Sequence, residues 1–235
     1  MLDGKGSDAG KAPSYPRGEP DASHVLHTVS AVDFANALFA LTGGGRCVTC
    51  GRSGSVLCPR CRQSLQRAEP VGPIFGVDRA VAGLEYEGPG RALVLALKLS
   101  ARREAAQPLM EALWEAVIRH GLRGTVLTWV PARRSDVRRR GFDHAALLAR
   151  GVSRRTGLAA RRLLVRTGAS LDQASLTAAE RHTNLGDAFS ARAASGRVVL
   201  VDDLVTTGAT ATACARALRA AGATGVELLA ACRTP

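Results

Sequence analysis

The chain has 235 residues, 46% of them apolar, which is enough to bury the core of one larger α/β domain and a small appendage. This apolar content excludes a wholly disordered chain, and no run of 18 or more apolar residues is present to span a membrane. The formal net charge is +12, and because residues 1–24 contribute −1, the remainder carries +13. Such a surplus favours a polyanionic partner, either nucleic acid or a phosphorylated substrate; the alternative is an arginine-rich chain with solvated basic faces.

The first residues predict a tail and then a short helix. Residues 1–28 are mostly polar and rich in Gly, Pro and Ser, which is typical of disorder, and they lack the basic and apolar regions of a signal peptide. We therefore expect a cytoplasmic protein. The segment 29–42 has apolar residues at helical spacing, so residues 29–70 are expected to form an amphipathic helix plus a cysteine module, and residues 71–235 the larger domain.

Four cysteines follow the helix with metal-binding spacing. Cys47, Cys50, Cys58 and Cys61 form C-x2-C-x7-C-x2-C. Each pair can hold a metal from a tight turn, and four thiolates match the tetrahedral preference of Zn²⁺. Structural zinc is favoured over disulfides or redox chemistry, and a closed four-cysteine site is expected to fold a module rather than catalyse.

From about residue 77 the chain alternates between strand and helix patterns. Strands are predicted within 77–88, 125–131, 161–166, 197–201 and 226–232, and helices over 89–100, 102–119, 141–157 and 208–223. This alternation predicts an α/β fold with a mostly parallel sheet flanked by helices. The polar segment 167–189 does not fit the alternation and is expected to be a functional loop or hood.

One lysine is unusual in this arginine-rich chain. The sequence has lysines only at positions 5, 11 and 98, so Lys98 is the only lysine outside the tail. A compact ammonium differs from a planar guanidinium, so Lys98 is either held by a geometric need or there by chance.

The stretch VVLVDDLVTTGAT, residues 198–210, carries the clearest signal. We expect Asp202 and Asp203 to follow the end of a buried strand, the edge at which open α/β sheets bind ligands. The next residues lead into a helix that starts at about Ala209, where free backbone N–H groups suit a phosphate. Thr206, Thr207 and Thr210 add hydroxyls, and Gly208 allows the backbone to approach closely. Acids beside a phosphate cradle match a sugar phosphate.

Three other interpretations of this stretch are weaker. A Walker B strand would need G-x4-G-K-[ST], and a dinucleotide site would need G-x-G-x-x-G; the chain contains neither. A plain helix cap explains one aspartate but not two acids followed by the small polar loop.

The stretch 198–210 resembles the phosphoribosyl pyrophosphate (PRPP) signature of type I phosphoribosyltransferases. From about residue 31 to 235 the chain resembles the ComF family of late-competence DNA-uptake proteins, through the cysteine module, Lys98, the segment VPARRSDVRRRGFDHAALLA, the tetrapeptide LLVR and the signature. Residues 71–235 are thus expected to form a phosphoribosyltransferase-like domain. The chain departs from the family at GGGRC, where a proline usually precedes the first cysteine, and at Asp143 and His144, where RGFNQ is typical.

The resemblance implies roles for particular residues. Asp202 and Asp203 would contact the ribose diol with Mg²⁺ nearby, and Thr206 to Thr210 would hold the 5′-phosphate. The loop 130–134 would be the pyrophosphate loop, with Arg133 or Arg134, together with Lys98, neutralising the leaving group. No general base is identified: Asp143 and His144 are candidates by chemistry only, and helix capping is favoured for Asp143.

Two functions remain open. The first is a phosphoribosyltransferase that binds PRPP with Mg²⁺ and transfers phosphoribose to an unknown acceptor. The second is non-catalytic: a DNA-binding factor that works with single-stranded DNA or the DNA-uptake machinery, or a PRPP-sensing regulator. Aromatic residues make up only 4% of the chain, which argues against strand binding by base stacking.

Overall fold

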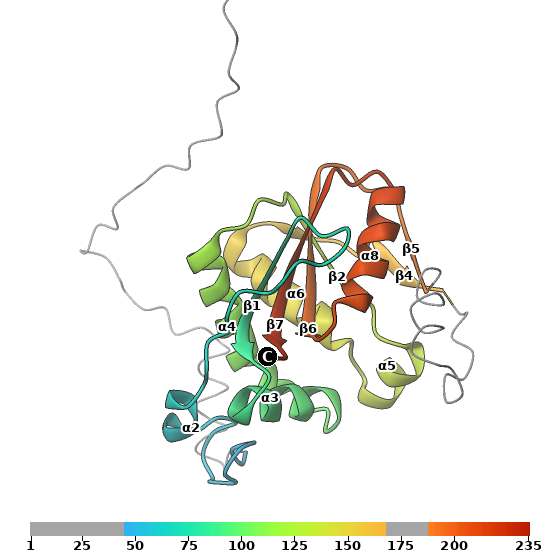
Figure 1. The fold of residues 1–235 in the computed structure, drawn as a ribbon. Helices are drawn as coiled ribbons and strands as arrows, with labels where there is room; N and C mark the ends of the chain where they lie inside the picture. Colours follow the sequence, from blue (N-terminus) through green and yellow to red (C-terminus); the bar gives the residue numbers. More distant parts are fainter. Residues whose placement is uncertain (1–44, 168–187) are drawn as a thin grey trace, which may run out of the picture. The chain divides into compact units, whose positions relative to one another are not determined.

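The computed structural model describes residues 45–167 and 188–235, and its main feature is a five-stranded parallel sheet (Figure 1). The strands lie in the order β1-β7-β6-β2-β3. Their bounds are Arg79–Glu85 for β1, Val126–Trp129 for β2, Ala159–Ala160 for β3, Arg197–Val205 for β6 and Gly225–Arg233 for β7. The prediction of a mostly parallel sheet flanked by helices is confirmed.

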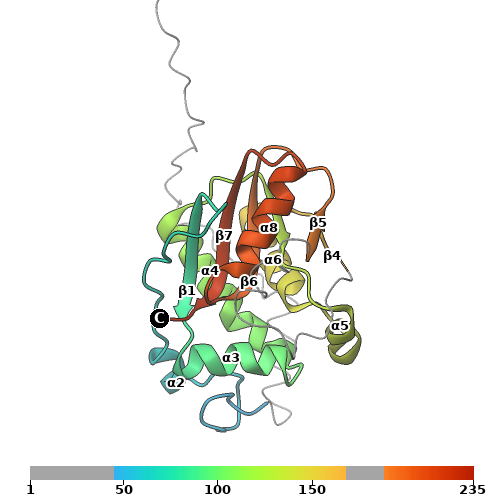
Figure 2. The ribbon, with the colours of Figure 1, turned by 45° about the vertical axis from the view of Figure 1, so that its right-hand side comes forward.

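Helices cover both faces of this sheet, as Figures 1 and 2 show. On β6, Val199 and Val201 pack into one core, while Val198 and Leu200 pack into the other. The first core also contains residues of α3 (Gly88–Lys98), α4 (Ala106–His120) and α6 (His144–Thr156), and the second contains residues of α8 (Ala209–Ala220). Alternate residues of a strand point to opposite faces, so a strand covered on both sides is apolar at successive positions.

Smaller elements lie between these. They are α2 (Pro59–Gln63), the 3-10 turn η1 (Arg103–Ala105), α5 (Arg134–Arg140), β4 (Leu164–Arg166) and β5 (Phe189–Ala191). The predicted strand 161–166 corresponds to β4, but β4 pairs antiparallel with β5 in a separate two-stranded sheet. The edge of the main sheet next to β2 is instead formed by β3. Its two residues are too few to give a sequence pattern.

The strand that carries the two acids is longer than expected. The sequence predicts an end at residue 201, but β6 continues through Asp202 and Asp203 to Val205 because its pairing with β7 continues as far as Val205 with Arg233. Its other neighbour, β2, stops at Trp129 opposite Val201. The acids therefore lie within a strand, at the carboxyl edge of the sheet, where one flanking strand has ended.

Capping residues define both ends of α6. Asp143 begins α6: its Oδ1 accepts from the N–H of Ala146 at 3.3 Å, and its Oδ2 accepts from the N–H of Ala132 at the same distance. Gly157 ends α6 in the left-handed conformation, with φ of 73°. The capping role favoured for Asp143 is confirmed.

Three expectations lie outside the described residues: the tail, the helix at 29–42, and nearly all of the segment 167–189. Within residues 45–167 and 188–235, no helix has both the length and the apolar character needed to cross a bilayer.

Candidate functional site

The two acids of β6 are buried, and Asp203 has two ionisable side chains as partners. Asp203 is 1% exposed and Asp202 is 8% exposed. The Nζ of Lys98 lies 3.0 Å from Oδ2 of Asp203, and Nε2 of His144 lies 3.5 Å from its Oδ1. The backbone N–H of Asp203 donates to Oδ1 of Asp202 at 2.9 Å. One end of the sheet thus holds a cation, an imidazole and two carboxylates together.

This environment gives the two acids different electrostatics. Burial raises the pKa of Asp202 well above its ordinary value, and the neighbouring charge of Asp203 raises it further. Burial also acts to raise the pKa of Asp203, but the hydrogen bond and charge of His144, together with the charge of Lys98, outweigh it and hold that pKa below its ordinary range. Asp203 is therefore the charged member of the pair.

Lys98 reaches the acids from the end of α3. Burial acts to lower its pKa, but the negative charge of Asp203 outweighs burial and leaves the pKa raised, so the side chain is an ammonium. The backbone carbonyl of Lys98 also accepts from Nη1 of Arg140 at 2.9 Å, which ties the end of α3 to α5. The structure gives this single lysine a defined partner.

The loop after β6 forms a small polar cradle. A cavity of about 50 Å³ is lined by Asp202 and by residues 204–211, with Leu228 behind them. Gly208 precedes α8 with φ of 75°, and a Cβ at this position would lie 2.9 Å from Ile74, so both conformation and packing require glycine. The first N–H groups of α8 and the positive end of its dipole suit an anion here.

A larger cavity of about 320 Å³ adjoins the cradle. Asp202, Thr206 and Thr210 line both. The other charged or ionisable residues that line the larger cavity are Lys98, Arg133, Asp136, Arg140, His144, Arg166 and Asp203. Burial lowers the pKa of Arg166, and the charge of nearby Arg133 adds to this effect, as expected for two cations that face one space.

The structure distinguishes two adjacent arginines that the sequence left as alternatives. Arg133 lines the cavity with the acids, whereas Arg134, the first residue of α5, lines a separate groove. Sequence reasoning did not select Arg166, Arg140 or Asp136. Arg166 is the last residue of the tetrapeptide LLVR, which belongs to the resemblance but was given no role, and the two residues of α5 lie in an arginine-rich run.

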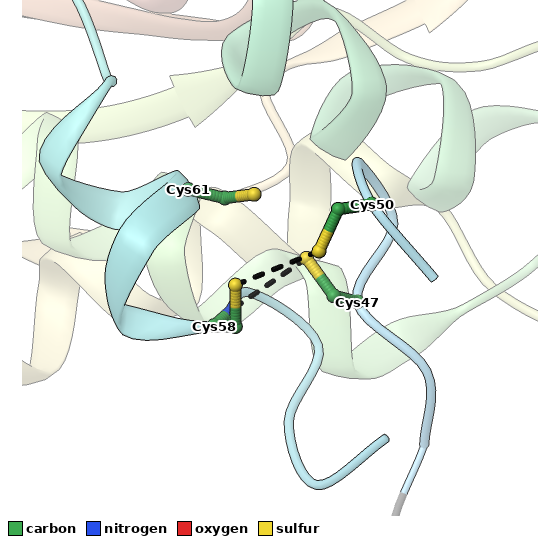
Figure 3. A group of neighbouring side chains, drawn as sticks. All are labelled: Cys47, Cys50, Cys58 and Cys61. Atoms are coloured by element: carbon green, nitrogen blue, oxygen red, sulfur yellow. Dashed lines mark hydrogen bonds between the residues drawn. The ribbon is translucent and has the colours of Figure 1, made fainter. Parts of the chain in front are cut away.

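The four cysteines of the N-terminal module converge on one point (Figure 3). Their sulfur atoms all lie within 4.8 Å of one another, and those of Cys50 and Cys58 are 3.7 Å apart. Zn–S bonds of about 2.3 Å in a tetrahedron place sulfurs about 3.8 Å apart, so the group fits zinc. None of the four forms a disulfide.

The backbone favours the thiolate form of Cys47. Gly51 closes the first turn with φ of 74°, and the N–H of Cys58 points at the sulfur of Cys47 at 3.5 Å. Burial acts to raise the pKa of Cys47, but the N–H groups of Cys50, Cys58 and Thr49 outweigh it and lower the pKa to about 6. A sulfur that is easily deprotonated is what a metal ligand requires.

The module is joined to the larger domain by its core and by polar contacts. Cys47, Leu57, Cys58 and Cys61 belong to the same core as α3, α4 and α6. Arg62 forms an ion pair with Glu111 of α4, and Nη2 of Arg102 donates to the carbonyl of Arg46 at 2.8 Å. By contrast, Cys214 and Cys232 are fully buried in α8 and β7, where burial raises the pKa of the Cys232 thiol to about 12.

These features make the chain a parallel α/β protein with a buried acid pair beside an anion cradle and with a four-cysteine module. It is 33% identical to the DNA utilization protein YhgH of Escherichia coli K12 over 218 residues, a match that spans 83% of this chain and 93% of that protein. The protein of the same name from Salmonella typhimurium LT2 is 32% identical over 215 residues, with the same coverage. The chain therefore belongs to the YhgH family.

Other comparisons are less informative. No family model matches the chain. The glutamine PRPP amidotransferase of B. subtilis, solved with ADP and GMP, matches 55% of this chain and 27% of its own, with a TM-score of 0.38 and 23% identity. A structure described as the allosteric regulatory enzyme of purine biosynthesis matches with the same TM-score, 21% identity and 26% of its own length. These scores are too low to support an argument about this chain.

Proposed function

We propose that the protein is a ComF-like member of the phosphoribosyltransferases, which binds PRPP with Mg²⁺ and transfers its phosphoribosyl group to an acceptor. The observation that carries this proposal is that two cavities share lining residues: Asp202, Thr206 and Thr210 line both the anion cradle and the larger basic cavity. The cradle suits a phosphate, the acids suit a diol and the basic cavity suits a pyrophosphate. PRPP carries these three groups in this order.

The residues divide among the parts of such a ligand. The N–H groups and hydroxyls of residues 206–210 hold the 5′-phosphate. Asp202 and Asp203 accept from the ribose hydroxyls, and their carboxylate oxygens also suit Mg²⁺, which prefers oxygen ligands and keeps several waters. Lys98, Arg133 and Arg166 neutralise the pyrophosphate. Zn²⁺ in the cysteine module has no part in this chemistry, because four thiolates leave no open position.

The reaction breaks the bond between C1 of the ribose and the pyrophosphate oxygen, which leaves with the bonding electrons. The acceptor forms a new bond to C1 and gives up its proton to solvent. Mg²⁺, when bound, adds positive charge beside the leaving group. The chain's own residues contribute by positioning: the cradle and the acids fix the ribose, while the cations lie where charge develops on the pyrophosphate.

Calorimetric titration with PRPP and Mg²⁺ tests this proposal. Wild type is expected to bind, and Asp202→Asn with Asp203→Asn is expected to lose about 100-fold in affinity, since it removes one hydrogen bond to the charged Asp203, at about 1.5–3 kcal/mol, and one to Asp202, at about 1 kcal/mol. Both acids are buried, so circular dichroism and thermal unfolding must first show that the variant is folded. Glu115→Gln, an exposed acid on α4 away from both cavities, is the matched control. Unchanged affinity in the folded double variant would refute the assignment.

A second function, DNA handling without turnover, is favoured by the relatives, which are named DNA utilization proteins, and by the +13 charge outside residues 1–24. The two functions differ in salt dependence. Binding through many DNA phosphates weakens steeply with salt, whereas pyrophosphate release from PRPP need not. Steeply salt-dependent DNA binding by a chain that neither binds nor turns over PRPP would favour the second function.

A further inference from the structure

A third cavity borders the loop 131–134. It has a volume of about 470 Å³. The residues that line it are Trp129, Ala132, Arg134, Val137, Arg138, Asp143, Ala146, Arg150 and Arg162. Ala132 lines this groove and also the cavity with the acids, and the next two residues diverge: Arg133 lines the acid cavity and Arg134 lines the groove. The two cavities are therefore neighbours that share one loop.

Four arginines line the groove without internal partners. Arg134, Arg138, Arg150 and Arg162 are exposed, and none forms an ion pair or hydrogen bond with its side chain within residues 45–167 and 188–235. Both oxygens of the groove's one acid, Asp143, are engaged: Oδ1 caps α6 by accepting from the N–H of Ala146, and Oδ2 accepts from the N–H of Ala132 in the loop. Like charges around one space repel each other, so the arrangement favours an anion with several negative charges.

The remaining surface of the groove is apolar. Trp129, Val137, Ala132 and Ala146 also line it, so the ligand should have an apolar part as well as charge. Small-molecule sites have volumes of about 300–1,000 Å³, and this cavity falls in that range. A guanidinium also pairs with phosphate through two parallel hydrogen bonds and stacks on planar rings.

We propose that this groove is a binding site for a free nucleotide with two or more phosphates, separate from the PRPP site. The phosphates pair with the arginines, and the base lies against the apolar residues. A single-stranded nucleic acid offers similar groups, but all four arginines line the same groove, whose volume of about 470 Å³ suits a single nucleotide. The proposal does not depend on PRPP binding.

Tryptophan fluorescence provides a local measurement, because the chain has only two tryptophans and Trp129 lines the groove. In a full-length Trp114→Phe background, ADP and GDP are the probes. We expect saturable quenching that fits one site. Arg150→Gln with Arg162→Gln should weaken binding at least about ten-fold for each guanidinium lost. Arg154→Gln is the matched control, since Arg154 is also exposed and on α6 but lies outside the groove, and its affinity should equal that of the background.

Additional variants and ligands distinguish this groove from the PRPP site and from a nucleic acid site. Asp202→Asn with Asp203→Asn should leave ADP binding unchanged, whether or not it abolishes PRPP binding. Several outcomes would overturn the proposal: no saturable binding, ADP binding that is lost with the two acids but kept without Arg150 and Arg162, or inorganic pyrophosphate binding as tightly as ADP. Tighter binding of an eight-residue oligothymidylate than of either nucleotide would assign the groove to a nucleic acid strand instead.

Discussion

At the scale of single residues, the site depends on how one buried carboxylate is neutralised. Asp203 is almost fully buried, yet it is charged, because Lys98 and His144 approach its two oxygens. A buried charge without partners is costly, so each partner contributes both to stability and to the position of the acid. The side chain of Lys98 is 33% exposed, which gives it access to the cavity as well as to Asp203.

Lys98→Met is expected to lower both stability and PRPP affinity. Loss of the 3.0 Å ion pair should reduce the free energy of unfolding by about 2 kcal/mol, between the values for exposed and buried pairs. Urea unfolding measures this change, and calorimetry measures the affinity. Lys98→Arg keeps the charge but not the compact ammonium, so it should recover stability more fully than affinity. A Met variant as stable as wild type would show that the ion pair does not support the fold.

At the scale of elements, the cysteine module is part of the domain rather than an appendage with its own core. Its cysteines and Leu57 pack into the core that holds α3 and α4, and an isolated β-bridge joins Arg67 to Leu84 of β1. α3 ends at Lys98, and α4 packs against β1. Unfolding of the cysteine module should therefore destabilise α3, the helix that carries Lys98.

Zinc removal should thus destabilise the larger domain. We expect about one zinc per chain in wild type, and none in Cys58→Ser with Cys61→Ser, because two thiolates do not hold the metal against a chelator. The double variant should unfold at a lower temperature than wild type. EDTA should shift wild type toward the variant and leave the variant unchanged. Elemental analysis and scanning calorimetry measure these effects, and a zinc-free wild type prepared under reducing conditions would contradict the assignment.

For the molecule as a whole, the sequence was sufficient for the order of the longer strands of the main sheet and of the four helices that cover it, but not for α5, β3 and β5. Apolar periodicity predicts α3, α4, α6 and α8, and continuous apolar runs predict β6 and β7. Sequence could not predict where β6 ends, because the end depends on β7 continuing as its neighbour after β2 has stopped. Pairing between distant strands is a tertiary property, and so is the short edge strand β3.

The candidate site also contains residues that the sequence identifies and residues that only the fold brings to it. Asp202, Asp203 and residues 206–210 are consecutive, so local chemistry identifies them, whereas Arg166 and Arg140 reach the cavity from other elements. Arg133 and Arg134 are neighbours with the same side chain, and only the start of α5 decides which of them meets the acids. In a chain with 29 arginines, residue type alone does not mark the important ones.

The scarcity of lysine has a practical consequence for measuring how the domain opens. Endoproteinase Lys-C cuts after lysine, and cuts at Lys5 and Lys11 remove only the first eleven residues, so Lys98 is its single target in the rest of the chain. That target lies at the end of α3, with its side chain paired to Asp203 and its carbonyl bonded to Arg140. We expect the folded protein to resist this cut and urea to release two fragments, residues 12–98 and 99–235. Because proteolysis follows the population of the open form, the cutting rate on a gel would report the opening of this one corner of the molecule, without any label.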